Sequence, residues 1–115
     1  MGSAWVPLLL HRLDHVGHLG HLGRRAIPSF GGALTRRPSE IFLEHIWVSP
    51  FPEEDVPALV DVIGPERVLM GSDFPHGEGT PKPADYAASL SGLDAATVRR
   101  IMRDNALELI CGTAA

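Results

Sequence analysis

The sequence has little of what marks several protein classes. Its single cysteine, Cys111, excludes an internal disulfide and fits a reducing cytoplasm. Ten basic against 14 acidic side chains give a formal net charge of −4, so no basic excess exists to neutralise the phosphates of a nucleic acid. The longest apolar run near the start, residues 4–10, is interrupted by Pro7 and is too short for a membrane span. We therefore expect a cytoplasmic protein that binds neither nucleic acid nor membrane.

Motifs of several large enzyme classes are also absent. The sequence contains no G-x-S-x-G elbow, Walker loop, C-x-x-C pair or G-x-G-x-x-G fingerprint. Serine hydrolase, P-loop NTPase, zinc-ribbon and dinucleotide-binding functions therefore lose their main support. Cys111 ends an apolar helical pattern with no acid-base residue beside it, which favours a buried or half-buried structural thiol over a nucleophile.

The composition that remains is that of a folded protein. Of 115 residues, 44% are hydrophobic and 21% are charged, whereas disordered chains are poor in apolar residues. On length alone, the sequence predicts one compact domain.

The first segment of the chain has a helical pattern of apolar residues. Apolar residues recur at helical spacing from Val6 to Val16, which predicts an amphipathic helix that ends near Gly17. The glycine-rich stretch 15–23 is interpreted as a fraying helix end or a loop, because each internal glycine costs a helix about 1 kcal/mol relative to alanine. A connection is expected over residues 26–38.

Further helices are predicted in the second half of the chain. A short helical turn is expected over residues 39–43, and a helix over about 83–90. A last helix, capped by Asp94, is expected to run to Cys111. Residues 112–115 are predicted to form an unstructured tail.

The centre of the chain has the order of a strand, a helix and a strand. Residues 45–49 and 67–71 each contain a short apolar run, and the first run is β-branched and aromatic. Between them, the acidic residues 53–55 favour a helix start, and Gly64 followed by Pro65 favours its end. This order predicts two parallel strands joined by a right-handed crossover.

Three histidines, His15, His18 and His21, have metal-like spacing. On a continuing helix the first two would share a face while His21 drifts away from it, and the interleaved glycines oppose such a helix. A solvated basic turn is the favoured interpretation, and a metal clamp is the alternative.

A polar loop, residues 72–81, follows the second predicted strand. In parallel α/β folds the carboxyl ends of strands carry the chemistry, so Asp73 is placed to ligate a metal or act as a base. Aspartate is also an ordinary turn former. Asp73, His76 and Glu78 together offer three ligands of suitable type, but the prolines and glycines between them do not force the side chains to converge.

The sequence motifs of this region resemble those of a known family. Residues 67–76, RVLMGSDFPH, resemble the last strand and metal loop of the amidohydrolase-related family, metal-dependent TIM-barrel hydrolases and decarboxylases that include aminocarboxymuconate semialdehyde decarboxylase. Other short motifs resemble those of the same family and follow in the same order over nearly the whole chain: Trp5-Val6-Pro7, Arg12-Leu13-Asp14-His15, Pro38-Ser39-Glu40, Trp47-Val48-Ser49, Gly64-Pro65-Glu66-Arg67 and Met102-Arg103-Asp104-Asn105-Ala106. This ordered series of motifs is more specific to the family than the single Gly-Ser-Asp-aromatic-Pro-His motif.

The resemblance implies an α/β fold class. The whole chain, residues 1–115, would be a partial domain: a C-terminal fragment of a (β/α)8 TIM barrel, mostly helical, with a small parallel two-stranded sheet. Residues 1–37 would be the helix and connection after the sixth strand, and 38–111 the last two β/α units and closing helices. Strand seven would cover Ile46 to Ser49, and strand eight Val68 to Gly71.

A barrel of this type needs about 250 residues, and two strands cannot close one. An isolated chain is therefore expected to leave its sheet edges unpaired and to expose apolar surface at Trp47, Val48, Leu69 and Met70.

The resemblance also implies a function. It is that of a metal-dependent hydrolase or carboxy-lyase (decarboxylase) acting on a small organic acid or a cyclic amide or ester, with this chain incomplete and inactive alone. Asp73 takes the role of the family's metal-binding and catalytic aspartate, which helps to handle the proton of bound water. The family's His-x-His pair is absent, so further ligands are expected upstream of Met1.

The remaining expectations concern the metal and the pocket. Zinc is the expected ion, and manganese or magnesium are the alternatives, because selectivity comes from ligands that this chain lacks. Trp5 is a candidate aromatic of the pocket wall. The candidate rim residues of the site are Ser72, His76 and Glu78.

A function of another class stays open. The chain is alternatively a non-catalytic interaction module that docks through an exposed sheet edge, either on a missing N-terminal barrel portion or on itself as a homodimer. A remnant with no independent function is the third hypothesis. In the full enzyme the expected partner is a small-molecule substrate.

Overall fold

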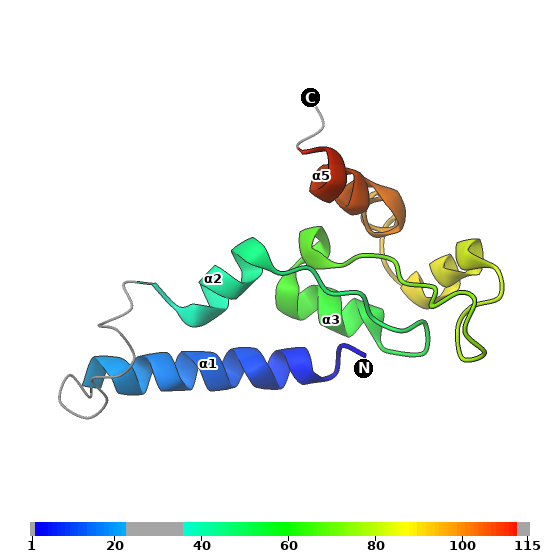
Figure 1. The fold of residues 1–115 in the computed structure, drawn as a ribbon. Coiled ribbons are helices and arrows are strands. Elements are labelled where there is room, and N and C mark those ends of the chain that lie inside the picture. Colours follow the sequence, from blue (N-terminus) through cyan, green and yellow to red (C-terminus); the bar gives the residue numbers. More distant parts are fainter. Residues whose placement is uncertain (1, 23–35, 113–115) are drawn as a thin grey trace. The chain divides into compact units, whose positions relative to one another are not determined.

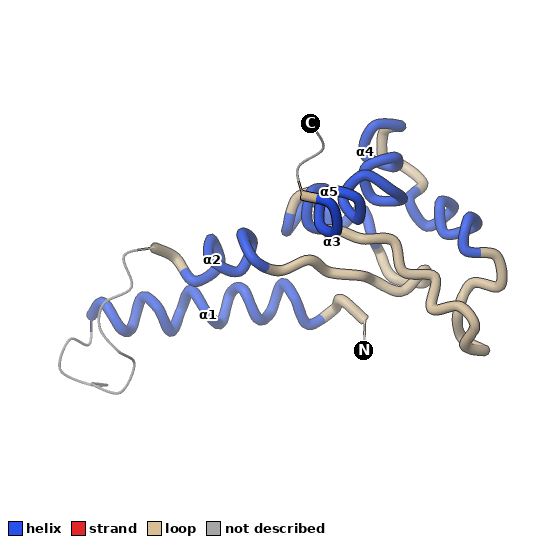
Figure 2. The backbone as a smooth tube through the Cα atoms, turned by 45° about the horizontal axis from the view of Figure 1, so that its top comes forward, coloured by secondary structure: helices blue, strands red, loops and turns tan. Residues whose placement is uncertain are grey.

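The computed structural model describes residues 2–22 and 36–112 (Figure 1). The chain divides into two units. The smaller is Trp5–Ile46, and the larger combines Met1–Ala4 with Trp47–Ala115. The smaller unit contains two α-helices, α1 (Trp5–Leu22) and α2 (Pro38–His45) (Figure 2). The α-helices of the larger unit are α3 (Val56–Ile63), α4 (Ala95–Arg99) and α5 (Asn105–Cys111). It also contains two 3-10 helices, η2 (Pro65–Arg67) and η3 (Pro83–Leu90), and one π-helix, η4 (Arg100–Asp104).

Helix α1 continues past its predicted end at Gly17 and reaches Leu22. The prediction of a loop or frayed end in this stretch is therefore wrong as far as Leu22. A helix that is already nucleated gains one hydrogen bond for each added residue, which offsets the modest cost of its glycines. Most of the predicted connection at 26–38 lies outside the described residues.

An aspartate of α1 caps the start of α2. The residue before α2, Arg37, provides no side-chain cap. Asp14 supplies one instead: its carboxylate accepts hydrogen bonds from the Ser39 backbone N–H at 2.9 Å and from the Ser39 hydroxyl at 2.7 Å. Desolvation opposes ionisation of Asp14, but these hydrogen bonds outweigh it and lower the pKa of the carboxyl. The two helices also meet through Trp5 and Phe42, whose rings pack edge to face at 6.3 Å.

The two predicted strands meet in one parallel bridge between Val48 and Val68. The Val48 N–H donates to the Arg67 carbonyl at 2.8 Å, and the Leu69 N–H donates to the Val48 carbonyl at 2.9 Å. The parallel direction is confirmed. The predicted two-stranded sheet is not, because within the described residues nothing extends this bridge into a ladder.

The backbone explains why the ladder stops on both sides. The next rung would need an N–H at position 50, and Pro50 has none. The previous rung would use the N–H of Arg67, which instead donates to the Gly64 carbonyl at 3.3 Å within η2. Each segment is thus limited to a single rung.

The segments are also less exposed than expected. Val48 is buried, which corrects the expectation that it lies open, and Trp47, Leu69 and Met70 are half-buried. The Arg67 guanidinium covers Trp47, with its central carbon 4.5 Å from the ring centroid. The core of the larger unit combines these segments with four residues of α3 and three from later helices: Val56, Leu59, Val60, Ile63, Tyr86, Leu90 and Ile101.

Local signals set the bounds of the helices around this core. Asp55 caps α3 by accepting the Ala58 N–H at 3.0 Å, and Gly64, at φ 82°, ends it as predicted. Asp94 caps α4, also as predicted, through the backbone N–H groups of Ala96 and Thr97.

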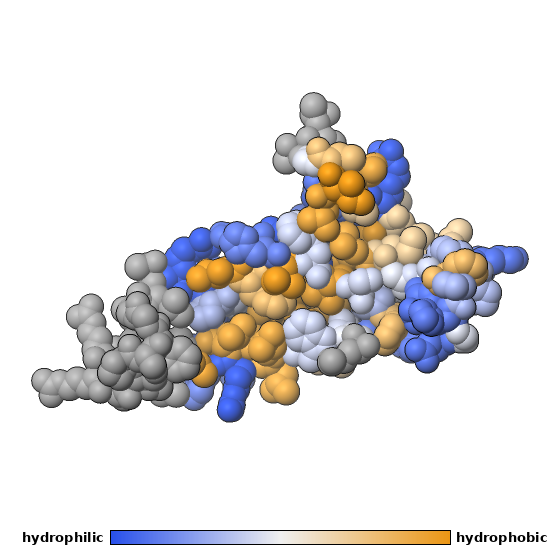
Figure 3. Space-filling model, in the orientation of Figure 1, coloured by the Kyte–Doolittle hydropathy of each residue, from blue (hydrophilic) through white to orange (hydrophobic). Residues whose placement is uncertain are grey.

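The C-terminal helical run differs from expectation in two respects. Its middle, η4, is a wide π-type turn between α4 and α5. Cys111 is exposed, which corrects its prediction as a buried or half-buried thiol. It lies in the last turn of α5, where Leu109 and Ile110 are also exposed. Figure 3 shows apolar atoms at the surface of α5.

Glu54 holds the first residues of the chain in the larger unit. Its carboxylate accepts the backbone N–H groups of Ser3 at 2.7 and 2.9 Å, Ala4 at 3.1 Å and Phe51 at 2.8 Å. Burial raises the pKa of Glu54, but the hydrogen bonds outweigh burial and lower it. Nearby, the buried Tyr86 donates its hydroxyl to the Pro50 carbonyl at 3.0 Å, and burial together with the Glu54 charge raises its pKa to about 12.

We expect the substitution Glu54→Gln to lower the free energy of unfolding at neutral pH by about 1–2 kcal/mol, because charge-assisted hydrogen bonds are lost. The folded pKa of Glu54 lies below its ordinary value of 4.5, so its contribution is full above that pH and is lost as the pH falls through the folded pKa. Urea unfolding at neutral pH and near pH 3 measures this difference, which should shrink at acid pH. Glu53→Gln, on the exposed neighbouring residue, should match the parent at both pH values; a Glu54→Gln difference that persists in acid would contradict the assignment.

Across the described parts of the chain, no helix is both long and apolar enough to cross a membrane.

Candidate functional site

The loop after the bridged segment 68–71 carries the candidate residues Ser72, Asp73, His76 and Glu78. Asp73 has a φ of 53°, and it is the one non-glycine residue with positive φ among those described. Aspartate tolerates this left-handed region better than most residues, and residues held there concentrate at functional sites. The structure therefore marks Asp73 independently of its position after the strand.

Backbone hydrogen bonds close the loop on itself. Thr80 donates its N–H to the Ser72 carbonyl at 2.7 Å, His76 donates to the Asp73 carbonyl at 2.9 Å, and Gly79 donates to the His76 carbonyl at 2.9 Å. A Cβ at Gly79 would lie 2.4 Å from the Asp73 carbonyl oxygen and 2.7 Å from that of Ser72. The absence of a side chain at Gly79 thus lets the end of the loop pack directly on the Asp73 backbone.

The candidate side chains differ in exposure. Ser72 and Asp73 are half-buried, whereas His76 and Glu78 are exposed. The Ser72 hydroxyl accepts the Phe74 backbone N–H at 3.3 Å, so Ser72 supports the turn at Asp73. Phe74 is 60% exposed, and the peptide bond between it and Pro75 is cis.

The described residues do not form a complete metal site. No group of three His, Cys, Asp or Glu side chains in ranges 2–22 and 36–112 could hold an ion, so Asp73, His76 and Glu78 are not brought together as a ligand set. His15 is exposed, and the side chains of His18 and His21 lie outside the described residues. Asp73 fits the chemistry of a metal site as one carboxylate ligand only.

Trp5 belongs to the other unit, where it packs on Phe42. Its assignment to a pocket wall stays a prediction.

Sequence reasoning missed the role of Asn105. This side chain is 1% exposed and donates from Nδ2 to the carbonyls of Pro65 and Val68, each at 2.7 Å, while its Oδ1 is buried without a partner. It clamps the backbone that leads into the segment before Asp73. The signal was a polar residue at helical spacing from the apolar residues Ile101, Met102 and Leu109.

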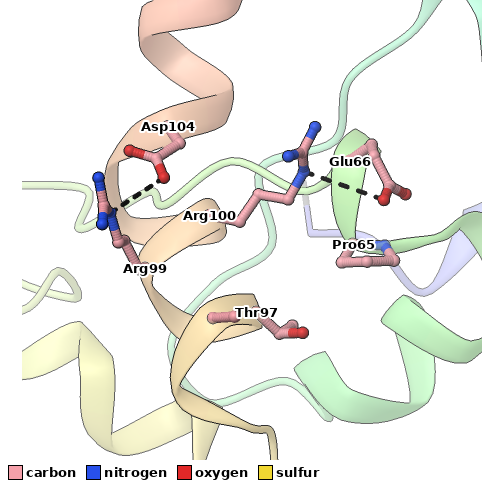
Figure 4. Close-up of a pocket in the computed structure, with 7 residues that line it drawn as sticks. Pro65, Glu66, Thr97, Arg99, Arg100 and Asp104 are labelled. Atoms are coloured by element: carbon pink, nitrogen blue, oxygen red, sulfur yellow. Dashed lines mark ion pairs between the residues drawn. The ribbon is translucent and has the colours of Figure 1, made fainter.

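An open hollow of about 330 Å³ lies between η2 and the start of the C-terminal helical run (Figure 4). Its charged residues are paired: Arg100 faces Glu66 across it at 3.9 Å, and Arg99 contacts Asp104 within the helical run at 3.2 Å. Because these charges already compensate one another, the hollow has little free charge to offer a ligand.

Comparison with known proteins decides the family. The family model described as Amidohydrolase matches residues 6–110. The chain belongs to the amidohydrolase family. This amidohydrolase chain is similar to the crystal structure of an amidohydrolase from Mycobacterium avium subsp. paratuberculosis, with a TM-score of 0.81 and 36% sequence identity over 94% of its length. It spans 26% of that chain, so it corresponds to about a quarter of the related protein.

Proposed function

We propose that this chain contributes the Asp73 loop to the active site of a metal-dependent hydrolase. The observation that carries the proposal is the conformation of Asp73, held at φ 53° directly after a bridged segment and packed on Gly79. Such a position needs surrounding structure to maintain it, which is the property expected of a preorganised catalytic group. Membership of the amidohydrolase family supports the same conclusion.

In this proposal Asp73 would offer a carboxylate oxygen to a divalent ion, and the same carboxylate would hold or return a proton of water. A bound ion of this kind supplies Lewis-acid chemistry and lowers the pKa of water. Zinc is the first candidate, and manganese or magnesium are the alternatives. The ligands beyond Asp73 would come from other parts of the complete site, because the described residues do not provide them.

The proposed substrates are a small organic acid or a cyclic amide or ester. Ser72 supports the Asp73 turn through its hydroxyl, and the exposed His76 and Glu78 would line the rim. Decarboxylation, as in the aminocarboxymuconate semialdehyde decarboxylase branch, is the finer alternative to hydrolysis within this proposal. A panel of carboxylated enol, lactone and amide substrates separates the two reactions.

The test is a chimera in which this chain replaces the matching part of the related Mycobacterium protein. We expect Asp73→Asn to lower turnover of any panel substrate at least about 100-fold and to reduce bound zinc, because one charged ligand is lost. Metal content by mass spectrometry gives a readout that does not depend on knowing the substrate. Asp61→Asn makes the same chemical change on the exposed surface of α3 and should retain parent turnover and metal.

Two results would refute the proposal. One is an Asp73→Asn chimera with the turnover and metal content of the parent. The other is Asp73-dependent turnover by the 115-residue chain alone, which would refute its catalytic incompleteness.

A further inference from the structure

The two bridged segments have one closed face and one open face. Val48 and Val68, which form the bridge, are only 5% and 0% exposed, so their side chains belong to the core. Successive side chains of an extended segment point to opposite sides, so the residues next to these valines point away from the core. We call the side that they form the open face. It carries Trp47, Ser49, Leu69 and Gly71.

Ser49 and Gly71 meet on the open face. A Cβ built at Gly71 would overlap the Ser49 hydroxyl oxygen and would lie 3.3 Å from the Ser49 Cβ. The Ser49 hydroxyl therefore occupies the space that a side chain at position 71 would fill. Glycine at this position is what leaves room for the hydroxyl.

The open face has the composition of a small-molecule site. Ser49 is exposed, whereas Trp47, Leu69 and Gly71 are half-buried. Within residues 2–22 and 36–112, the Ser49 hydroxyl has no hydrogen-bond partner. Sites for small molecules are mostly apolar, with a few polar groups that fix the orientation of the ligand. The Ser49 hydroxyl meets this description, because its neighbours on the open face are an indole, an isobutyl side chain and a glycine.

The Ser49 hydroxyl also lies near the start of the Asp73 loop. Gly71, which it contacts, precedes Asp73 by two residues. Two extended residues span at most about 7 Å, so a small organic molecule bound at Asp73 can also reach Ser49.

We propose that Ser49 is a substrate-binding residue of the amidohydrolase site, and that its hydroxyl donates a hydrogen bond to a carbonyl or carboxylate oxygen of the substrate. Such an oxygen is the acceptor that the acids, amides and esters of the proposed function share, and a hydroxyl is a suitable donor to it. The inference rests on the proposed function. It adds a residue that selects and orients the substrate to the aspartate that acts on the metal and the water.

The test uses the chimera with the Mycobacterium amidohydrolase and two probes, benzoate for a carboxylate and δ-valerolactam for a cyclic amide. We expect at least one probe to bind saturably by calorimetric titration. Ser49→Ala should weaken benzoate about tenfold and the lactam about threefold, because a hydrogen bond to a charged oxygen is the stronger one. Ser91→Ala, the same change at an exposed serine after η3, should bind like the parent. Lack of saturable binding by both probes, or equal binding by the two serine variants, would overturn the proposal.

Gly71→Ala tests the contact that positions the hydroxyl. The added methyl group would take the place of the Ser49 hydroxyl, and the short serine side chain can rotate away from it. Gly71→Ala should therefore weaken the probe as much as Ser49→Ala does. The double variant should bind no more weakly than either single variant, since the hydroxyl can be lost only once. Losses that add in the double variant would contradict the assignment.

Bound zinc separates this inference from the proposed function. Ser49→Ala should retain the zinc content of the parent chimera, whereas Asp73→Asn should reduce it. A loss of zinc in Ser49→Ala would overturn the substrate-binding role, because the hydroxyl would then act on the metal site. Weaker probe binding in Ser49→Ala together with full zinc in Asp73→Asn would support the Ser49 role and refute the role of Asp73.

Discussion

Replacing Gly79 by alanine should displace the Asp73 loop. The added Cβ would meet the Asp73 carbonyl oxygen at 2.4 Å and its carbonyl carbon at 2.6 Å, and backbone atoms cannot rotate away as a flexible side chain can. We expect a loss of about 1–3 kcal/mol in the free energy of unfolding, in line with overpacking elsewhere. Faster amide exchange at Thr80, whose N–H is bonded to Ser72, would locate the change in the loop.

Gly77 provides the control within the same loop. No heavy atom lies within 4 Å of a Cβ built there, so Gly77→Ala should be neutral, or slightly stabilising through the unfolded state. In the chimera, Gly79→Ala should also reduce turnover and bound zinc, whereas Gly77→Ala should not. Equal behaviour of the two variants would show that the close approach of Gly79 does not hold Asp73 in place.

Substitution of Asn105 should produce the largest loss of stability in the larger unit. Asn105→Ala leaves the Pro65 and Val68 carbonyls without their donor, with an expected cost of about 2–3 kcal/mol. Asn105→Asp should cost more, about 3–5 kcal/mol, because it places a carboxylate against two carbonyl oxygens at a site where Oδ1 has no donor. Chemical unfolding at neutral pH measures both.

The pH response separates the two Asn105 variants. The aspartate introduced at position 105 would have a folded pKa above its unfolded value near 4, so its penalty is small below that pH and grows as the pH rises through the folded pKa. Asn105→Asp should therefore approach the stability of Asn105→Ala in acid, since a protonated carboxyl can again donate. Arg103→Ala, at an exposed position two residues earlier, should change stability by less than about 0.5 kcal/mol. A difference between the Asp and Ala variants that does not depend on pH would contradict the clamp.

Local chemistry explains which parts of the fold were predictable. Asp55, Asp94 and Gly64 each act within four residues of themselves, so the bounds of α3 and the start of α4 followed from the sequence. The end of α1 did not, because glycine propensity is a weak term against helix propagation.

The sheet shows the limit of pattern reasoning. Apolar runs predicted two strands, and the helix between them predicted their parallel direction. Pro50, which lacks an N–H, accounts for one missing rung of the ladder. The ladder ends on the other side because the Arg67 N–H donates to the Gly64 carbonyl and not to the neighbouring segment. Composition does not reveal which of these two acceptors the N–H takes.

The candidate site also has features that were visible in the sequence and features that depend on the fold. The position of Asp73 after an apolar run was visible in the sequence, whereas its left-handed backbone and its contact with Gly79 depend on the folded loop. Asn105 was missed as a clamp because its acceptors lie 37 and 40 residues away in the chain.

The Glu54 contacts have a consequence for the connectivity of the protein. Residues 5–46 form an insertion: the larger unit begins before them with Met1–Ala4 and resumes after them at Trp47. The hydrogen bond between Ser3 and Glu54, 51 positions apart, is the non-covalent clasp at the entry of this insertion. Loop-closure entropy grows only with the logarithm of length, about 0.6 kcal/mol for each doubling, so the insertion can change length across related chains with little effect on the clasp. Without Glu54, Ser3 and Ala4 would lose the hydrogen bonds that hold the entry of the insertion on the larger unit.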